Sequence, residues 1–119
     1  MYKMLIVDDS MIIRNKIARL PSNASYKIVG KAKNGMEAVD LFRTFKPDIV
    51  TMDLTMPEMD GLECIQELIK IDSEVQILVI SALSDKATGI KALELGANGF
   101  LTKPFSDDEL LKTLNELME

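Results

Sequence analysis

The chain contains no histidine, no tryptophan and only one cysteine in 119 residues. The absence of histidine excludes acid–base catalysis by an imidazole, and the chain therefore cannot supply a phosphohistidine of its own. The single cysteine, Cys64, cannot form an internal disulfide, which is typical of a reducing compartment. We therefore expect a cytoplasmic protein in which Cys64 is a small apolar residue rather than a redox sensor.

Long hydrophobic runs are also absent. The apolar run near the N-terminus, Met4 to Val7, is far too short for a signal peptide or a membrane-spanning helix, so we expect no membrane insertion. The chain carries 14 Lys and Arg against 19 Asp and Glu, and this net charge of −5 argues against direct binding to nucleic acid. With 47% hydrophobic and 28% charged residues, the composition predicts one globular domain over residues 1–119.

Short apolar runs alternate with amphipathic segments along the chain. Strands are predicted at 3–7, 26–29, 49–52, 75–80 and 98–102, and each is followed by a segment with helical spacing of apolar residues. Strands that alternate with helices form a parallel sheet that is covered on both faces. The sequence therefore predicts a (βα)5 three-layer α/β sandwich around a parallel five-stranded sheet.

The helical segments carry signals for their ends and for their buried faces. Ser10 and Asp60 are predicted N-caps, and Gly96 is predicted to end the fourth helix. In the second helix, which Lys46-Pro47 ends, Phe45 is predicted to lie on the buried face. The buried face of the fourth helix is predicted to carry Ala87, Ile90 and Leu93.

Polar side chains follow four of the predicted strands. Asp8 and Asp9 come after the first strand, Asp53 after the third, Ser81 after the fourth and Lys103 after the fifth. The carboxyl ends of parallel strands meet at one edge of the sheet, where open α/β sheets place their ligands. We therefore expect three acids, a hydroxyl and a lysine to converge.

Three of these residues have an ordinary structural explanation when they are taken alone. Asp9 fits a helix cap, Ser81 a loop hydroxyl and Lys103 a solvated charge. Asp53 has no such explanation, because an acid directly after a buried strand gains nothing structural there. A structural explanation would also have to account for all five polar residues on one edge at once. Asp53 is therefore the candidate reactive residue.

Three carboxylates at one edge need charge compensation. Two of them about 5 Å apart repel by roughly 3 kcal/mol at an effective dielectric constant of about 20, so the group must bind a cation or take up a proton. Hard oxygen ligands suit Mg²⁺, for which Mn²⁺ can substitute. A carboxylate can also attack phosphorus to give an aspartyl phosphate, while a metal and a lysine neutralise the charge.

Four motifs in this order resemble the receiver domain of bacterial response regulators, especially the stand-alone chemotaxis proteins of the CheY type. They are Leu5-Ile-Val-Asp8-Asp9-Ser10, the block from Asp53 through Met56-Pro57 to Asp60-Gly61, Ser81-Ala82, and Phe100-Leu-Thr-Lys103-Pro104-Phe105. The resemblance covers essentially the whole chain. It implies the flavodoxin-like, CheY-like strand order 2-1-3-4-5.

The resemblance implies a role for each residue at the strand ends. Asp53 would be the phosphoacceptor and Asp9 a direct Mg²⁺ ligand. Asp8 would hold the ion through water, and the backbone carbonyl of Thr55 would complete the protein ligands. Lys103 would pair with the phosphoryl oxygens, and the peptide bond that follows it would be cis. The domain would be no enzyme in the usual sense, but it would catalyse its own phosphorylation and dephosphorylation.

The resemblance also implies a switch in two steps. The phosphoryl group would draw in the Ser81 hydroxyl, and the ring of Phe100 would turn inward, which would reshape the surface of the fourth helix, fifth strand and fifth helix. The family usually binds its partners at that surface. Typical chemotaxis members have tyrosine where this chain has Phe100, so a partner contact through that hydroxyl is not expected. Thr55 and Leu83 occupy the variable positions that would tune dephosphorylation.

The partners implied by the resemblance are a histidine kinase, a downstream protein such as the flagellar motor switch, and a phosphatase. The chain would be a monomer or a dimer driven by phosphorylation. Other functions stay open: a receiver excised from a longer regulator, a phosphorelay intermediate, an aspartate-nucleophile phosphatase, and a flavin or dinucleotide carrier. An aspartate-nucleophile phosphatase requires a second acid at the position of Thr55. A flavin or dinucleotide carrier typically has a G-x-G-x-x-G motif, which the sequence does not contain.

Overall fold

The computed structural model describes residues 1–19, 26–56, 59–82 and 86–118, in which strands and helices alternate as predicted. The strands are β1 (Tyr2–Val7), β2 (Tyr26–Ala32), β3 (Ile49–Met52), β4 (Gln76–Ala82) and β5 (Gly99–Lys103). The helices are α1 (Met11–Arg19), α2 (Gly35–Phe45), α3 (Gly61–Ile71), α4 (Lys86–Glu94) and α5 (Asp107–Met118). β3 has the predicted bounds at both ends, whereas β2 and β4 extend further toward the C-terminus than predicted.

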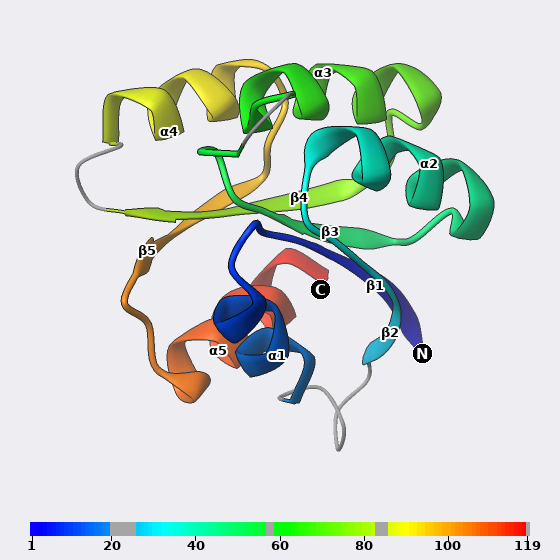
Figure 1. Cartoon of the computed structure of the whole chain (residues 1–119). Coiled ribbons are helices and arrows are strands. Elements are labelled where there is room, and N and C mark those ends of the chain that lie inside the picture. The colour runs from blue at the N-terminus through cyan, green and yellow to red at the C-terminus, as the bar shows by residue number, and fades with distance from the viewer. Residues whose placement is uncertain (20–25, 57–58, 83–85, 119) are drawn as a thin grey trace.

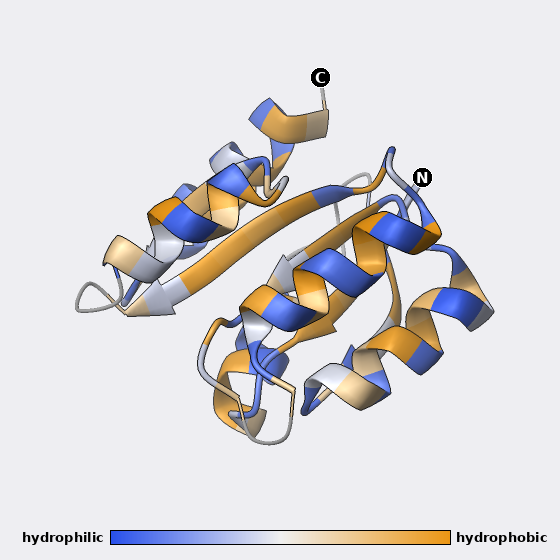
Figure 2. Cartoon of the chain, turned by 90° about the horizontal axis from the view of Figure 1, so that it is seen from above, coloured by the Kyte–Doolittle hydropathy of each residue, from blue (hydrophilic) through white to orange (hydrophobic). Residues whose placement is uncertain are grey.

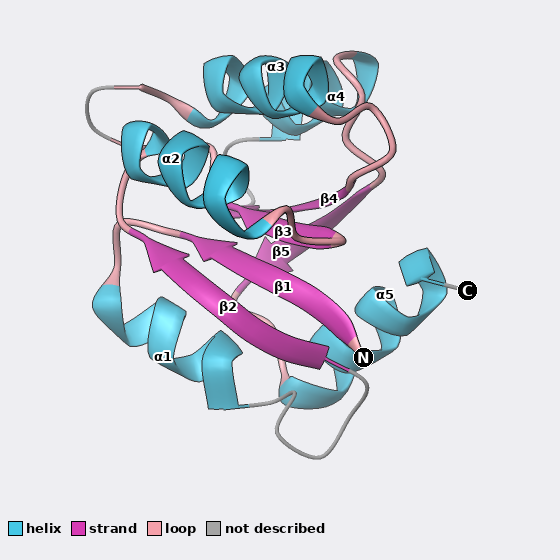
Figure 3. Ribbon diagram, turned by 90° about the vertical axis from the view of Figure 1, so that its right-hand side faces the viewer, coloured by secondary structure: helices cyan, strands magenta, loops and turns pink. Residues whose placement is uncertain are grey.

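The strands form one parallel sheet in the order β2-β1-β3-β4-β5 within the described part of the chain. Helices α2, α3 and α4 lie over one face of this sheet, and α1 and α5 lie over the other (Figure 1). The view from the side shows the same three layers (Figure 3). The predicted fold class and strand order are therefore confirmed. None of the described helices is long and apolar enough to cross a membrane.

Side chains of each strand alternate between two hydrophobic cores. In β1, Leu5 and Val7 belong to the core on the side of α2, α3 and α4, whereas Met4 and Ile6 belong to the core on the side of α1 and α5. All four are buried, because helices cover both faces of the sheet. Figure 2 shows the apolar strands between helices whose surfaces alternate between apolar and polar residues.

The predicted helix ends are largely confirmed. The side chains of Ser10 and Asp60 each accept a hydrogen bond from the backbone N–H three residues later, at 3.3 Å and 2.9 Å, as N-caps do. Lys46 ends α2 in the left-handed conformation with φ of 47°, and Gly96 after α4 has φ of 121°. Phe45, predicted to be buried, is 40% exposed, because it is the last residue of α2 and stands beyond the packed turns.

The buried face of α4 differs from the prediction. Gly89 and Ala92 are its buried residues, whereas Ile90 is 53% and Leu93 42% exposed, and Ala87 is exposed as well. The prediction was wrong because the helical spacing of apolar residues fits two neighbouring stripes, and the stripe with Ala87, Ile90 and Leu93 was chosen over the one with Gly89 and Ala92. The helix instead turns its small residues toward the sheet, where an aromatic ring of β5 already occupies the space beside Gly89.

Thr51 in β3 offers a way to raise the stability. Its side chain is 1% exposed, and its hydroxyl has no hydrogen-bond partner in the part of the chain that the structure describes. A buried polar group without a partner costs about 1–3 kcal/mol, and valine has nearly the same shape without the hydroxyl. We expect Thr51→Val to raise the free energy of unfolding by about 1 kcal/mol in urea denaturation.

The control for this substitution is Thr44→Val. Thr44 is exposed, and its hydroxyl donates to the backbone carbonyl of Asp40 at 3.0 Å, so its removal should bring no gain. An equal gain in both variants would attribute the effect to valine itself. No gain in Thr51→Val would show that the Thr51 hydroxyl is satisfied in solution.

Candidate functional site

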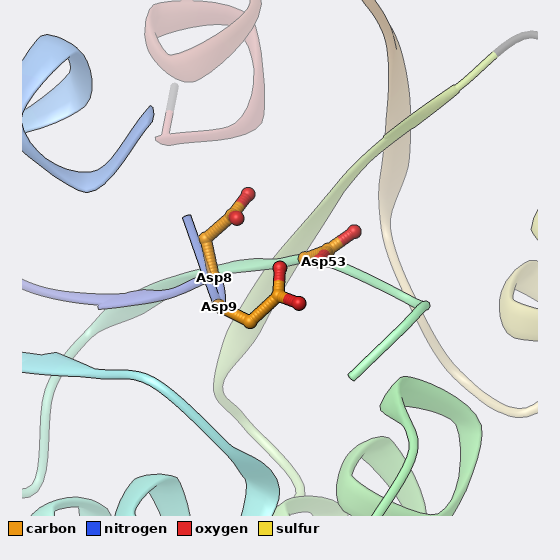
Figure 4. Close-up of side chains that lie close together, drawn as sticks. All are labelled: Asp8, Asp9 and Asp53. Atoms are coloured by element: carbon orange, nitrogen blue, oxygen red, sulfur yellow. The ribbon is translucent and has the colours of Figure 1, made fainter. Parts of the chain in front are cut away.

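The ends of β1 and β3 bring three carboxylates together. The register pairs Val7 with Met52, and the backbone N–H of Asp53 donates to the carbonyl of Val7 at 2.9 Å, so the residues that follow these strands are neighbours. One carboxylate oxygen each of Asp8, Asp9 and Asp53 lies within 4.8 Å of the others. Figure 4 shows the three side chains close together where the two strands end. The predicted convergence of the acids is present.

Asp8 is the most firmly held of the three. It is 1% exposed, and its Oδ1 accepts a hydrogen bond from the backbone N–H of Ser10 at 2.9 Å. The guanidinium of Arg14, one turn into α1, donates to the backbone carbonyl of Asp8 at 2.7 Å. Asp9, by contrast, is exposed. The protein therefore holds Asp8 in place, whereas the side chain of Asp9 is accessible to a ligand.

Lys103 closes the site from β5. Its Nζ lies 2.9 Å from Asp8 Oδ2 and 3.5 Å from Asp53 Oδ1. Burial alone lowers the pKa of Lys103, but the hydrogen bond with Asp8 and the charge of Asp53 outweigh it and raise the pKa overall. Lys103 therefore stays protonated, and it holds one positive charge between two buried carboxylates. The peptide bond between Lys103 and Pro104 is cis, as predicted.

Asp53 is the acid with a strongly perturbed pKa. It is 4% exposed, and burial, helped by the charge of Asp8, raises its pKa from 3.8 to about 6. Lys103 and the backbone N–H of Thr55 act in the opposite direction but do not cancel the rise. The carboxylate of Asp53 is thus ionised near neutral pH at a cost in free energy that a bound cation would relieve.

The remaining predicted residues surround the acids at different depths. A pocket at this edge is lined by Asp9, Asp53, Thr55, Ala82 and Lys103. Ser81 is fully buried near the end of β4. Phe100 does not line this pocket. It pairs with Val79, whereas Ser81 pairs with Thr102, so Phe100 lies two residues before the level of Ser81 in the sheet. Leu83 lies outside the described residues.

The donor set of the site fits a hard divalent cation. Three carboxylates face one lysine, so the cluster carries an excess of negative charge, and two of its acids are nearly inaccessible to water. Carboxylate oxygens are the ligands preferred by Mg²⁺, which keeps several waters and binds through one or two carboxylates. Asp9 and Asp53, which line the pocket, could hold such an ion directly.

The raised pKa of Asp53 makes the free energy of unfolding depend on pH, and Asp53→Asn should remove this dependence. Because the folded protein binds this proton more tightly than the unfolded chain, stability is lost as pH rises from 3.8 to about 6. The loss is at most about 3 kcal/mol. With EDTA present, we expect Asp53→Asn to be more stable than the wild type at pH 7 and nearly equal to it at pH 4, as measured by urea denaturation. A pH-independent difference would contradict the raised pKa.

The single cysteine lies in the core and not at the site. Cys64 is fully buried, its thiol donates to the carbonyl of Gly35 at 3.7 Å, and burial raises its pKa to about 12. It is therefore an unreactive core residue, as predicted.

The sequence did not identify two residues that shape the site. Arg14 was not among the predicted site residues, but its guanidinium donates to the backbone carbonyl of Asp8. Gly61 was named only as part of the Asp60-Gly61 motif, but a Cβ there would stand 2.6 Å from the carbonyl oxygen of Asp53. The spacing of six residues between Asp8 and Arg14, which is one helical turn beyond the cap, was the available signal for Arg14.

Comparison with known proteins gives consistent relatives. The family model for the response regulator receiver domain matches residues 4–115. The chain is 43% identical over 115 residues to the chemotaxis protein CheY of Thermotoga maritima, covering 97% of this chain and 96% of that protein. It is 40% identical over 116 residues to CheY of Listeria monocytogenes, covering 98% of each. The CheX–CheY–BeF3–Mg²⁺ complex of Borrelia burgdorferi is structurally similar, with a TM-score of 0.93, 30% identity and coverage of 99% and 90%.

Proposed function

This chain belongs to the response regulator receiver domain family, and from that membership we propose that it receives a phosphoryl group on Asp53 in a Mg²⁺-dependent reaction. As a receiver domain closely similar to CheY proteins, it is a phosphoacceptor of two-component signalling in chemotaxis rather than a conventional enzyme. The observation that carries the assignment of the site is the pairing of a buried acid of raised pKa with two more acids and a lysine. We assign the role to one domain over residues 1–119.

The proposed reaction is an in-line displacement at phosphorus. An oxygen of ionised Asp53 forms a bond to phosphorus while the bond from phosphorus to the donor breaks, and the donor leaves with the electron pair. Lys103 Nζ, 3.5 Å from Asp53 Oδ1, supports this by its charge and by hydrogen bonds to the phosphoryl oxygens. In dephosphorylation a water oxygen forms a bond to phosphorus while the bond from phosphorus to the Asp53 oxygen breaks, the Asp53 carboxylate leaves with the electron pair, and the water gives up a proton to solvent. We propose that the domain catalyses both steps.

A divalent cation would bind between the acids and the phosphoryl group. We assign Asp9 and Asp53 as direct ligands, Asp8 as a ligand through water, and the backbone carbonyl of Thr55 as the remaining protein ligand. The ion is Mg²⁺, for which Mn²⁺ can substitute. When bound, it neutralises charge on the phosphoryl oxygens. Asp8 contributes in another way as well, since its ion pair with Lys103 at 2.9 Å orients the lysine.

The signal leaves the site through Ser81 and Phe100 in this proposal. The Ser81 hydroxyl moves to the phosphoryl group, and Phe100 turns inward, which changes the surface of α4, β5 and α5 for a downstream protein such as the flagellar motor switch. The donor is a histidine kinase, and Thr55 and Leu83 tune how fast a phosphatase or water removes the group. We place this exchange in the cytoplasm, as a monomer or a phosphorylation-driven dimer.

Intact-mass spectrometry after incubation with acetyl phosphate tests the proposal. We expect the wild type to gain one phosphoryl group with Mg²⁺ and none with EDTA. We expect this dependence on Mg²⁺ because three acids and one lysine leave the site with excess negative charge, which repels an anionic phosphoryl donor unless a cation compensates it. No gain with Mg²⁺, together with no binding of beryllofluoride, would refute the phosphoacceptor function. Turnover of p-nitrophenyl phosphate would favour a phosphatase instead.

A further inference from the structure

The ring of Phe100 in β5 lies directly against Gly89 in α4. A Cβ added at position 89 would stand 2.1 Å from Cε2 and 2.6 Å from Cδ2 of the ring, far inside the contact distance of about 3.5–4.0 Å between carbon atoms. Gly89 is buried, although its neighbour Ile90 is 53% exposed. Helix and ring can therefore approach this closely only because position 89 has no side chain.

Apolar space adjoins this contact on the outer side. Lys86, Gly89, Ile90, Leu93 and Phe100 line a pocket between α4 and β5 whose surface is almost entirely apolar. Phe100 is half-buried and forms part of the pocket wall. We name this arrangement, with the ring against Gly89, the outward position of Phe100.

The inner side of Phe100 leads toward the phosphoacceptor site. Phe100 and Ser81 lie on the same face of the sheet, because Phe100 pairs with Val79 and Ser81 is two residues further along β4. Ser81 is fully buried at the end of β4, between Phe100 and the acids. In the proposed switch, the ring turns inward when the Ser81 hydroxyl moves to the phosphoryl group.

We propose that Gly89 is a positioning residue that holds Phe100 outward and thereby sets the balance between the two states of the switch. This inference rests on the proposed function, because the inward state is the phosphorylated one. A side chain at position 89 would raise the free energy of the outward state, whereas the inward state leaves that space empty. A ligand that favours the inward state would then bind more tightly to a Gly89→Ala variant.

A double-mutant cycle separates this role from helix propensity. Alanine normally stabilises a helix relative to glycine, so Gly89→Ala alone should raise the urea midpoint if the ring is irrelevant. We expect Gly89→Ala to lower the midpoint or leave it unchanged when Phe100 is present, and to raise it in the Phe100→Ala background, where no ring is in the way. Lys91→Ala, at an exposed position of the same helix, should behave alike in both backgrounds.

The functional measurement is the affinity for beryllofluoride with Mg²⁺, which stands in for the phosphoryl group. We expect Gly89→Ala to bind it about five- to tenfold more tightly than the wild type, because part of the cost of moving the ring is already paid. In the Phe100→Ala background the same substitution should leave the affinity unchanged. Lys91→Ala should leave it unchanged in both backgrounds.

Three results would overturn the inference in distinguishable ways. An equal rise of the urea midpoint in both backgrounds would show that the ring does not lie against Gly89 in solution. Equal beryllofluoride affinity in the wild type and Gly89→Ala, with coupling in the urea cycle, would remove the regulatory role but keep the contact. If no variant binds beryllofluoride, the proposed phosphoacceptor function fails, and the urea cycle still decides independently whether the contact exists.

Discussion

We expect Asp53→Asn to take up no phosphoryl group from acetyl phosphate under conditions in which the wild type is fully modified. The asparagine side chain keeps nearly the same shape but loses the negative charge and the nucleophilic oxygen. Its carboxamide oxygen is also a weaker metal ligand than a carboxylate. Asp8 does not line the pocket, and Asp9 follows β1 rather than β3, so neither acid occupies the position of the proposed acceptor. The modification should therefore fall below detection in the intact mass.

The raised pKa of Asp53 predicts that the neutral variant stays folded near pH 7, and urea denaturation of the same sample checks this. The matched control is Asp40→Asn, which removes an exposed acid on α2 that does not line the pocket at Asp53, and it should be modified like the wild type. A phosphoryl group gained at an unchanged rate by Asp53→Asn would place the acceptor on another residue and overturn the assignment.

The position of the site followed from the sequence because it depends on a few strong patterns. Each strand is a short apolar run, and polar residues mark where it ends. In a parallel sheet those ends must share an edge, and the register pairs Val7 with Met52, which leaves Asp8 and Asp53 side by side. The strand order itself came from the resemblance, since apolar runs do not reveal which strands are neighbours.

The features that the sequence did not reveal depend on close packing rather than on periodicity. In α4 the apolar residues form two stripes, and spacing alone does not say that small Gly89 and Ala92 face the sheet instead of Ile90 and Leu93. The choice is made by Phe100, whose ring needs the space that glycine leaves. Contacts between residues distant in sequence, such as Lys16 Nζ with the carbonyl of Phe105 at 2.6 Å, are equally invisible to a pattern.

Gly61 is the packing feature whose loss should cost the most. A Cβ at this position would stand 2.5 Å from the Cα of Leu54 and 2.6 Å from the carbonyl oxygen of Asp53, and both are backbone atoms that no rotamer change can move. The backbone N–H of Gly61 also donates to the carbonyl of Leu54 at 3.0 Å, which fixes the start of α3 against the segment after β3. Any side chain must therefore push this segment, and Asp53 with it.

We expect Gly61→Ala to lower the free energy of unfolding by about 2 kcal/mol, the net of overpacking and of the opposing gain from alanine in a helix. Because Asp53 moves relative to Lys103, phosphorylation by acetyl phosphate should also slow in the fraction that stays folded. The matched control is Gly99→Ala, where the three atoms nearest to a Cβ belong to the side chains of Leu117 and Leu78, at 3.4 Å. A urea midpoint in Gly61→Ala as high as in Gly99→Ala would mean that the segment after β3 can shift without loss of stability. The contact with Gly61 would then not be needed to position Asp53.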